Sequence, residues 1–224
     1  MASDAPLPPS IDRADQALPL ARAVADADAD RLIRTEPISC SAGCSACCVQ
    51  AVPVRPAEVR SIRQHLAALD ADEREAVEGR IEGAVTRLRD AGISEPWADP
   101  ADPAERRAMV RRYFEAGVSC PFLTDAGTCG IRPVRPLACR EYLVTSDPVH
   151  CATLGSSVVR IRSTRDSLAG FGKVSRALGE PEVGWLTFAM ATDPPPPPAH
   201  PPVSGLHVAQ VLTVQRLADP PAQD

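Results

Sequence analysis

Cysteine is the residue that most constrains this 224-residue chain, because its eight cysteines fall into two groups of four. Roughly seventy cysteine-free residues separate a dense first group from a second group that is spread along the chain. The first group comprises Cys40, Cys44, Cys47 and Cys48, and the second comprises Cys120, Cys129, Cys139 and Cys151. Thiolates at short spacings are typical ligands of zinc and of iron–sulfur clusters. We therefore expect all eight cysteines to be metal ligands.

Four disulfides are the alternative use of eight cysteines, and they are typical of secreted domains. The segment Met1–Ala5 begins without the apolar core of a signal peptide, and no run of eighteen apolar residues is present to span a membrane. We therefore expect a cytoplasmic protein with reduced thiols and no membrane partner. The net charge of −5 is spread along the chain without a basic block, so we also expect no nucleic-acid partner.

The composition predicts a mainly α-helical, small domain that a cysteine-ligated metal site staples together through irregular loops. Residues 1–35, rich in Ala and Asp, are expected to be a flexible N-terminal lead-in in which Pro19 interrupts any helix. Residues 36–191 are expected to form the cysteine-cluster domain. Residues 192–224 are expected to be a Pro-rich tail, with Pro194–Pro198 as a polyproline II spacer.

Apolar residues at three- and four-residue steps predict four helices. The first begins near Pro56, the second follows a cap at Asp72, the third follows Asp102, and the fourth ends at Gly179. Their inward residues are predicted to be Val59, Ile62, Leu66 and Leu69; Val77, Ile81, Ala84, Val85 and Leu88; Met109, Val110, Tyr113 and Phe114; and Leu168, Phe171, Val174 and Leu178.

The adjacent pair Cys47 and Cys48 raises the question of how many metal centres there are. Neighbouring side chains point to opposite sides of a strand, and about 100° apart on a helix, so the pair does not easily serve one tetrahedral ion. Either one of the two is not a ligand, or the two thiols face different centres. The second interpretation would use all eight cysteines as two four-thiolate sites.

Charged neighbours could adjust such a centre, because four thiolates around zinc carry a net charge of about −2. Arg132, Arg135 and Arg140 flank two of the cysteines and are either counter-charges or surface residues. His150 adjoins Cys151 and is either a ligand, a donor to a ligand, or simply exposed.

The order of residues in both cysteine blocks resembles the YkgJ-type cysteine-cluster family, which is described as a zinc- or iron-chelating domain. The resemblance covers residues 38–155. Its motifs are Cys40-Ser-Ala-Gly-Cys44-Ser-Ala-Cys47-Cys48, Cys120-Pro-Phe-Leu123, Cys129-Gly-Ile-Arg-Pro-Val-Arg-Pro-Leu-Ala-Cys139-Arg140-Glu-Tyr142, and Cys151.

The resemblance implies a metal-binding domain that holds an iron–sulfur cluster, zinc, or both. One branch of the family is similar to flagellin lysine N-methylases, and this implies an alternative in which the chain transfers methyl groups from S-adenosylmethionine to protein lysine. Glu141 and Tyr142 are then the first candidates for substrate contacts, although we favour ordinary packing beside the metal as their role. A third hypothesis is a redox-sensing or interaction module. The sequence assigns no catalytic residue.

Overall fold

The computed structural model describes residues 9–93, 102–153, 157–161, 166–180 and 184–213 of the chain. The helices in these ranges are α1 (Ala14–Thr35), α2 (Pro56–Ala67), α3 (Ala71–Asp90), α4 (Pro103–Glu115), α5 (Leu137–Arg140), α6 (Ser167–Ala177), α7 (Leu186–Ala191) and α8 (Gly205–Thr213). The strands are β1 (Ser10–Ile11), β2 (Pro53–Val54), β3 (Leu143–Val144), β4 (Arg160–Ile161), β5 (Gly184–Trp185) and β6 (Val203–Ser204). They pair antiparallel as β1–β6, β2–β5 and β3–β4. The mainly α-helical class expected from the sequence is confirmed.

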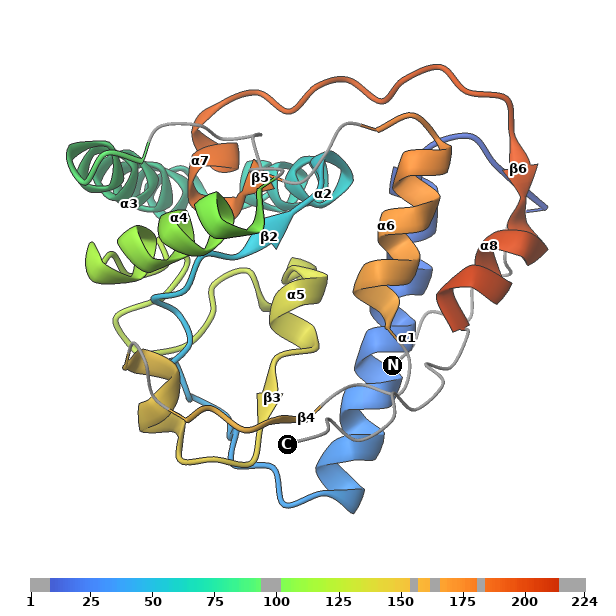
Figure 1. Ribbon diagram of the computed structural model, residues 1–224. Coiled ribbons are helices and arrows are strands. Elements are labelled where there is room, and N and C mark those ends of the chain that lie inside the picture. Colours follow the sequence, from blue (N-terminus) through green and yellow to red (C-terminus); the bar gives the residue numbers. More distant parts are fainter. Residues whose placement is uncertain (1–8, 94–101, 154–156, 162–165, 181–183, 214–224) are drawn as a thin grey trace.

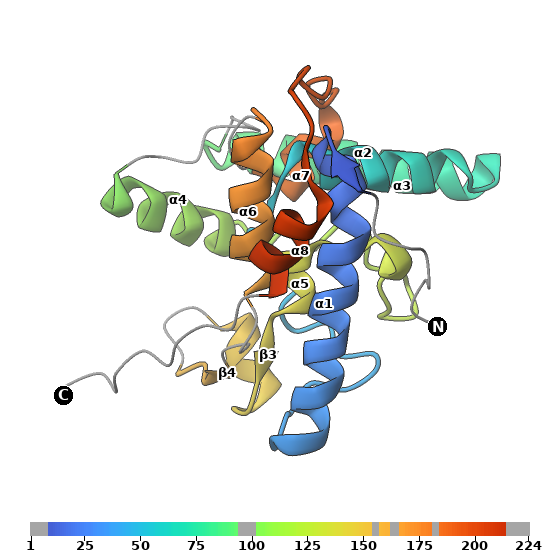
Figure 2. The same ribbon diagram turned by 90° about the vertical axis from the view of Figure 1, so that its right-hand side faces the viewer.

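Two hydrophobic cores lie on either side of α2 (Figures 1 and 2). We call the core around α3 and α7 the α3 core, and the core around α1, α6 and α8 the α1 core. The α3 core includes Ile62, Leu88, Tyr113, Phe122 and Phe188. The α1 core includes Ile11, Leu18, Leu137, Phe171 and Leu212. Within the described residues, no helix has the length and apolar character needed to cross a membrane.

The expectation of a flexible lead-in is wrong for Ala14–Thr35, which form the longest helix described. Pro19 lies inside this helix on its exposed side, so its missing N–H costs one backbone hydrogen bond without disturbing the buried face. That buried face includes Ala17, Leu18 and Ala21, and it packs against α6 and α8. Burial of this face stabilises a helix that Pro19 alone disfavours.

The Pro-rich tail also contains more structure than the sequence predicted. Gly205–Thr213 form α8, whose Val208 and Leu212 are buried in the α1 core. Pro194–Pro198 form an extended connection that arches from α7 to β6 in Figure 1. Residues 214–224 lie outside the described residues, as do residues 1–8, and the division of the chain at residues 35 and 191 stays a prediction.

The four predicted helices are present, with two differences in detail. Asp70, not Asp72, caps α3 by accepting a hydrogen bond from the Glu73 backbone N–H at 2.8 Å. Tyr113 is buried on α4, Met109 and Phe114 are half-buried, and Val110 is 38% exposed, so the apolar face predicted for this helix is only partly covered. Gly179, with φ of +75°, follows the end of α6 as predicted.

A fully buried carboxylate connects α2 to the cysteine-bearing helix α5. Glu58 Oε1 accepts a hydrogen bond from the Leu137 N–H at 2.9 Å, and Oε2 accepts one from the Arg55 N–H at 2.9 Å. Leu137 is the first residue of α5, so Glu58 satisfies one of the free backbone donors at the start of that helix. Glu58 thereby fixes the position of the first residue of α5 and, with it, the position of Cys139 in that helix.

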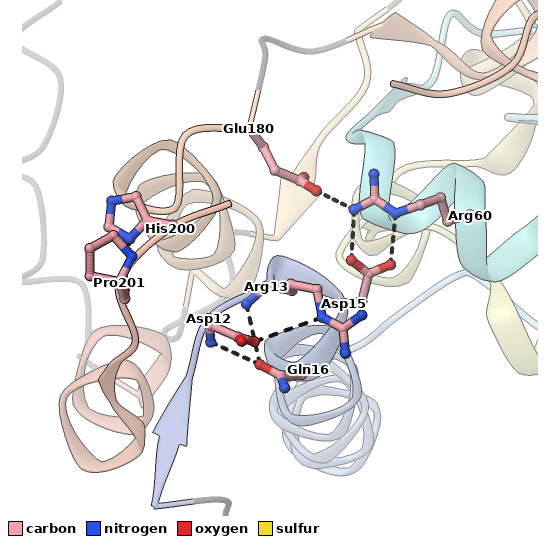
Figure 3. A network of polar contacts seen from close by, with 8 residues as sticks. All are labelled: Asp12, Arg13, Asp15, Gln16, Arg60, Glu180, His200 and Pro201. Atoms are coloured by element: carbon pink, nitrogen blue, oxygen red, sulfur yellow. Dashed lines mark hydrogen bonds and ion pairs between the residues drawn. The ribbon is translucent and has the colours of Figure 1, made fainter. Parts of the chain in front are cut away.

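An arginine clasp holds the tail against the body of the protein (Figure 3). Arg60 on α2 forms a bidentate pair with Asp15 at 2.8 and 2.7 Å and a second ion pair with Glu180. It also donates to the Pro195 carbonyl at 2.9 Å. The Glu180 side chain is only 1% exposed, so it depends on Arg60 for charge compensation.

We predict that Arg60→Met destabilises the protein by about 3 kcal/mol, because it leaves the Glu180 carboxylate buried without a cation. Chemical denaturation monitored by circular dichroism measures the change. Arg74→Met is the matched control, since the Arg74–Glu78 pair is long, at 4.0 Å, and exposed on both sides. Equal effects of the two substitutions would contradict the importance assigned to the clasp.

Candidate metal centre

The first cysteine group lies on the loop between α1 and β2, and backbone hydrogen bonds connect the start of this loop to β3. The Ser39 N–H donates to the Val144 carbonyl at 2.8 Å, and the Ser39 hydroxyl donates to the Thr145 carbonyl at 3.0 Å. Gly43, with φ of +86°, allows the tight turn between Cys40 and Cys44. The loop is therefore anchored beside the second cysteine block.

The second group approaches the first through Cys120. The Cys120 N–H donates to the Cys48 carbonyl at 2.6 Å, which joins the two cysteine segments directly. Beyond Cys120 the chain turns back, so that Leu123 bridges Cys129 and the Gly130 N–H donates to the Phe122 carbonyl at 2.8 Å. This turn brings Cys129 back beside the Cys120 segment.

Cys139 and Cys151 reach the same region on short helical segments. Cys139 lies in α5, which Glu58 anchors, and Cys151 lies in the 3₁₀ turn Pro148–Ala152. Gln50, two residues after the Cys47–Cys48 pair, donates from its side chain to the Cys151 carbonyl at 2.9 Å. Both cysteine blocks therefore meet in one part of the fold, near α5, β3 and β4 in Figure 1.

All eight cysteines are free thiols, in agreement with the preference for thiols over disulfides. Cys44 is exposed, Cys151 is buried at 3% exposure, and the other six are intermediate. Burial raises the pKa of Cys139, and a hydrogen bond with the Cys48 thiol, followed by burial, raises the pKa of Cys47. These thiols are therefore protonated at neutral pH as long as no cation compensates their charge.

At Cys120, hydrogen bonds from backbone amides oppose the increase in thiol pKa that burial causes. Burial raises the pKa of Cys120 to about 11, while hydrogen bonds from the Phe122 and Leu123 amides to its sulfur act in the opposite direction. Amide donors directed at a sulfur favour its thiolate form. The turn after Cys120 is thus suited to a thiolate ligand.

Electrostatic coupling between the thiols defines two neighbourhoods within the region. In the first neighbourhood, Cys40, Cys44 and Cys47 all act to raise the pKa of Cys151. Cys44 and Cys47 also act to raise the pKa of Cys40. In the second, Cys47, Cys120 and Cys129 all act on Cys139. Cys151, although it ends the second sequence block, therefore lies with the first group.

Of the three flanking arginines, Arg135 is the one whose charge reaches the thiols. It lowers the pKa of Cys40, Cys47 and Cys139, and its guanidinium donates to the Cys139 carbonyl. Arg140 instead pairs with Asp26 at 2.5 and 2.6 Å, and Arg132 is exposed. Arg135 is thus the candidate counter-charge for bound thiolates.

Within the described part of the chain, the His150 imidazole has no hydrogen-bond or ion-pair partner. Glu141 and Tyr142 are engaged within the chain itself. Glu141 accepts from the Leu168 N–H at 3.0 Å, and Tyr142 accepts from Gln50 at 3.1 Å. These contacts agree with packing beside the cysteines, and no observation on the described residues favours methyl transfer.

The residues present fit a thiolate-bound metal in their chemistry, since eight free thiols converge on one region with amide donors and one nearby cation. Among the described residues, however, no three His, Cys, Asp or Glu side chains are already spaced to hold an ion. Metal binding would therefore have to draw the thiols closer together, and part of the binding free energy would go into ordering the site.

Two contributors to the region were missed from the sequence. Glu58 lies ten residues after Cys48 and outside both cysteine blocks, and no pattern marks it beyond its place in the first turn of a helix that begins with proline. Gln50 lies two residues after the Cys47–Cys48 pair, and that proximity was the only available signal.

Comparison with known proteins agrees with this chemistry. The family model "CxxCxxCC: Putative zinc- or iron-chelating domain" matches residues 39–154, which is more than half of the chain. No curated protein and no solved structure gives a significant match.

We predict that Arg135→Met slows alkylation of Cys40 about threefold at pH 8 in the metal-free protein. Loss of the positive charge raises the pKa of the thiol and so reduces its reactive thiolate fraction. Peptide mapping by mass spectrometry after brief iodoacetamide treatment measures the rate. Arg135→Lys should retain the wild-type rate, and so should Arg132→Met. A wild-type rate in Arg135→Met would contradict the electrostatic role.

A pH prediction follows from Glu141, whose pKa burial raises to about 7. Because the folded-state pKa is higher than the unfolded value of about 4.3, the contribution to stability is complete below the unfolded pKa. It is lost as the pH rises through about 7. Glu141→Gln keeps an acceptor for the Leu168 N–H but cannot titrate, so its melting temperature should fall less than that of the wild type between about pH 5 and 8.

Differential scanning fluorimetry across this pH range measures the effect. Glu105→Gln, on the exposed side of α4, is the control and should follow the wild-type profile. Parallel profiles for wild type and Glu141→Gln would show that Glu141 does not titrate as predicted.

Proposed function

The chain belongs to the CxxCxxCC family, and from this membership and the meeting of its two cysteine blocks we propose that it is a metal-binding protein whose eight cysteines are the ligands. The metal is zinc or iron, the latter as an ion or an iron–sulfur cluster, because thiolates suit both. The observation that carries this proposal is the hydrogen bond from the Cys120 N–H to the Cys48 carbonyl, which joins the two blocks.

We further propose two metal centres, each of which takes cysteines from both sequence blocks. Cys40, Cys44 and Cys151 would belong to one centre, and Cys120, Cys129 and Cys139 to the other. Each centre then takes one member of the Cys47–Cys48 pair. The support for this division is that Cys151 couples to the early cysteines, whereas Cys47 couples to both neighbourhoods.

The division agrees with the geometry of adjacent side chains. Because Cys47 and Cys48 point in different directions, the pair suits two neighbouring centres better than one. Cys48 also carries the carbonyl that binds the Cys120 segment, so its position beside the second neighbourhood is fixed by the backbone. Two four-thiolate centres with divalent metal would carry about −2 each, and Arg135 is placed to offset part of that charge.

A bound metal would supply crosslinks between residues 36–54 and 119–151, which close a long loop of the chain and so stabilise the folded state. Because the ligands come from both blocks, a bound metal would stabilise the fold whether or not the protein catalyses a reaction. The free state of all eight thiols further supports a reducing compartment, and we propose the cytoplasm as the place where the protein works.

The decisive experiment is anaerobic purification followed by metal analysis and a visible spectrum. Broad brown absorption indicates an iron–sulfur cluster, and a colourless sample with stoichiometric zinc indicates zinc. A wild-type protein that takes up neither metal under these conditions would refute the proposal.

We predict that Cys44→Ser and Cys139→Ser each lower the metal content by about half, because each removes a ligand from a different centre, and that each lowers the melting temperature. The double variant should lose nearly all metal. Ser41→Ala, in the same loop, is the control and should keep wild-type metal content. Complete metal loss in each single variant would favour one shared centre over two.

A further inference from the structure

A small polar network of Gln50, Tyr142 and Arg160 lies around Cys151, the cysteine with the smallest exposed fraction. Gln50 contacts both Tyr142 and Cys151, and Arg160 lies over the Tyr142 ring with its guanidinium carbon 4.5 Å from the ring centre. Cys151 is 3% exposed, so its sulfur has little access to water as a hydrogen-bond partner. The polar side chains beside this thiol are therefore the candidate hydrogen-bond partners of its sulfur.

The orientation of the Gln50 amide follows from its partners. Gln50 lies 2.9 Å from the Cys151 backbone carbonyl, which accepts hydrogen bonds but cannot donate them. The Gln50 atom facing this carbonyl must therefore be the –NH₂ nitrogen. The same nitrogen lies 3.1 Å from the Tyr142 hydroxyl oxygen, to which it donates its second proton.

The direction of the Tyr142 hydroxyl proton follows in turn. Because the oxygen accepts from Gln50, its own proton is left to donate to another atom. The Cys151 side chain is within hydrogen-bonding reach of this hydroxyl. A sulfur in the thiolate form can only accept, so the pair is matched as donor and acceptor when Cys151 binds metal.

Arg160 contacts the face of the Tyr142 ring. Its guanidinium stacks on the tyrosine ring, and a cation over an aromatic face is electrostatically attracted to the ring. Arg160 belongs to β4, which pairs with β3 immediately after Tyr142. The ring is thus fixed between a β-strand pair and Gln50.

We propose that Tyr142 is a positioning residue of the metal centre, in which its hydroxyl donates a hydrogen bond to the Cys151 sulfur while Gln50 and Arg160 hold the ring in place. The inference rests on the proposed metal-binding function and adds a residue outside the cysteine set. Donors that support a metal ligand fix its orientation, and their loss weakens metal binding by about 10- to 100-fold.

The test uses the full-length protein, reduced, stripped of metal and loaded anaerobically with Co²⁺ as the probe. Tyr142→Phe removes only the hydroxyl. It should keep the Co²⁺ stoichiometry, shift the sulfur-to-cobalt charge-transfer absorption, and speed Co²⁺ release to a chelator about tenfold. Gln50→Leu keeps the hydroxyl but not its orientation, and it should shift the same band by a smaller amount.

Tyr113→Phe is the matched control, since Tyr113 is also buried and bonded, in its case to the Thr187 hydroxyl at 2.8 Å. It should change stability but leave the absorption band and the release rate as in the wild type. Identical bands and release rates in Tyr142→Phe, Gln50→Leu and wild type would overturn this inference alone. Failure of the wild type itself to bind Co²⁺, zinc or iron would overturn the proposed function together with it.

Discussion

The contact on which the site most depends is the buried Glu58 carboxylate. It accepts hydrogen bonds from the backbone N–H of Arg55, which caps its own helix, and from that of Leu137 at the start of α5. Burial raises the pKa of Glu58, and both amides oppose that shift. One side chain thereby sets the distance between α2, which borders both hydrophobic cores, and the segment that continues from Cys139 to β3.

The sequence predicted the fold where local signals were strong. Pro56 and Asp102 mark the starts of α2 and α4, and Gly179 follows the end of α6. The prediction failed for α1, because Pro19 was given more weight than the spacing of alanines and Leu18 on one face. It failed again for α8 because the packing of Val208 and Leu212 against distant helices leaves no local signal. Tertiary burial decided both helices, and a single sequence does not reveal which helices will meet.

For the candidate metal centre, the spacing of the cysteines predicted the chemistry but not how the thiols are grouped. Cys151 closes the second block in the sequence, yet hydrogen bonds through Gln50 place it beside the first. The sequence marks three arginines alike as candidate counter-charges for the thiolates. Only the fold distinguishes Arg135, whose charge acts on the thiols, from Arg140, which pairs with Asp26. Such distinctions depend on side-chain direction, and the order of residues along the chain does not encode that directly.

The pairing of β1 with β6 and the packing of α1 against α6 and α8 have a consequence for synthesis on the ribosome. Because translation runs from the N-terminus, α1 is made well before residues 167–177 and 205–213, against which much of its apolar face packs. Before those residues are made, only the part of this face that meets α2 and α5 can be buried. Contacts this distant in sequence form slowly and leave nascent chains open to aggregation. Shielding of α1 until α6 and α8 have been made would reduce that risk.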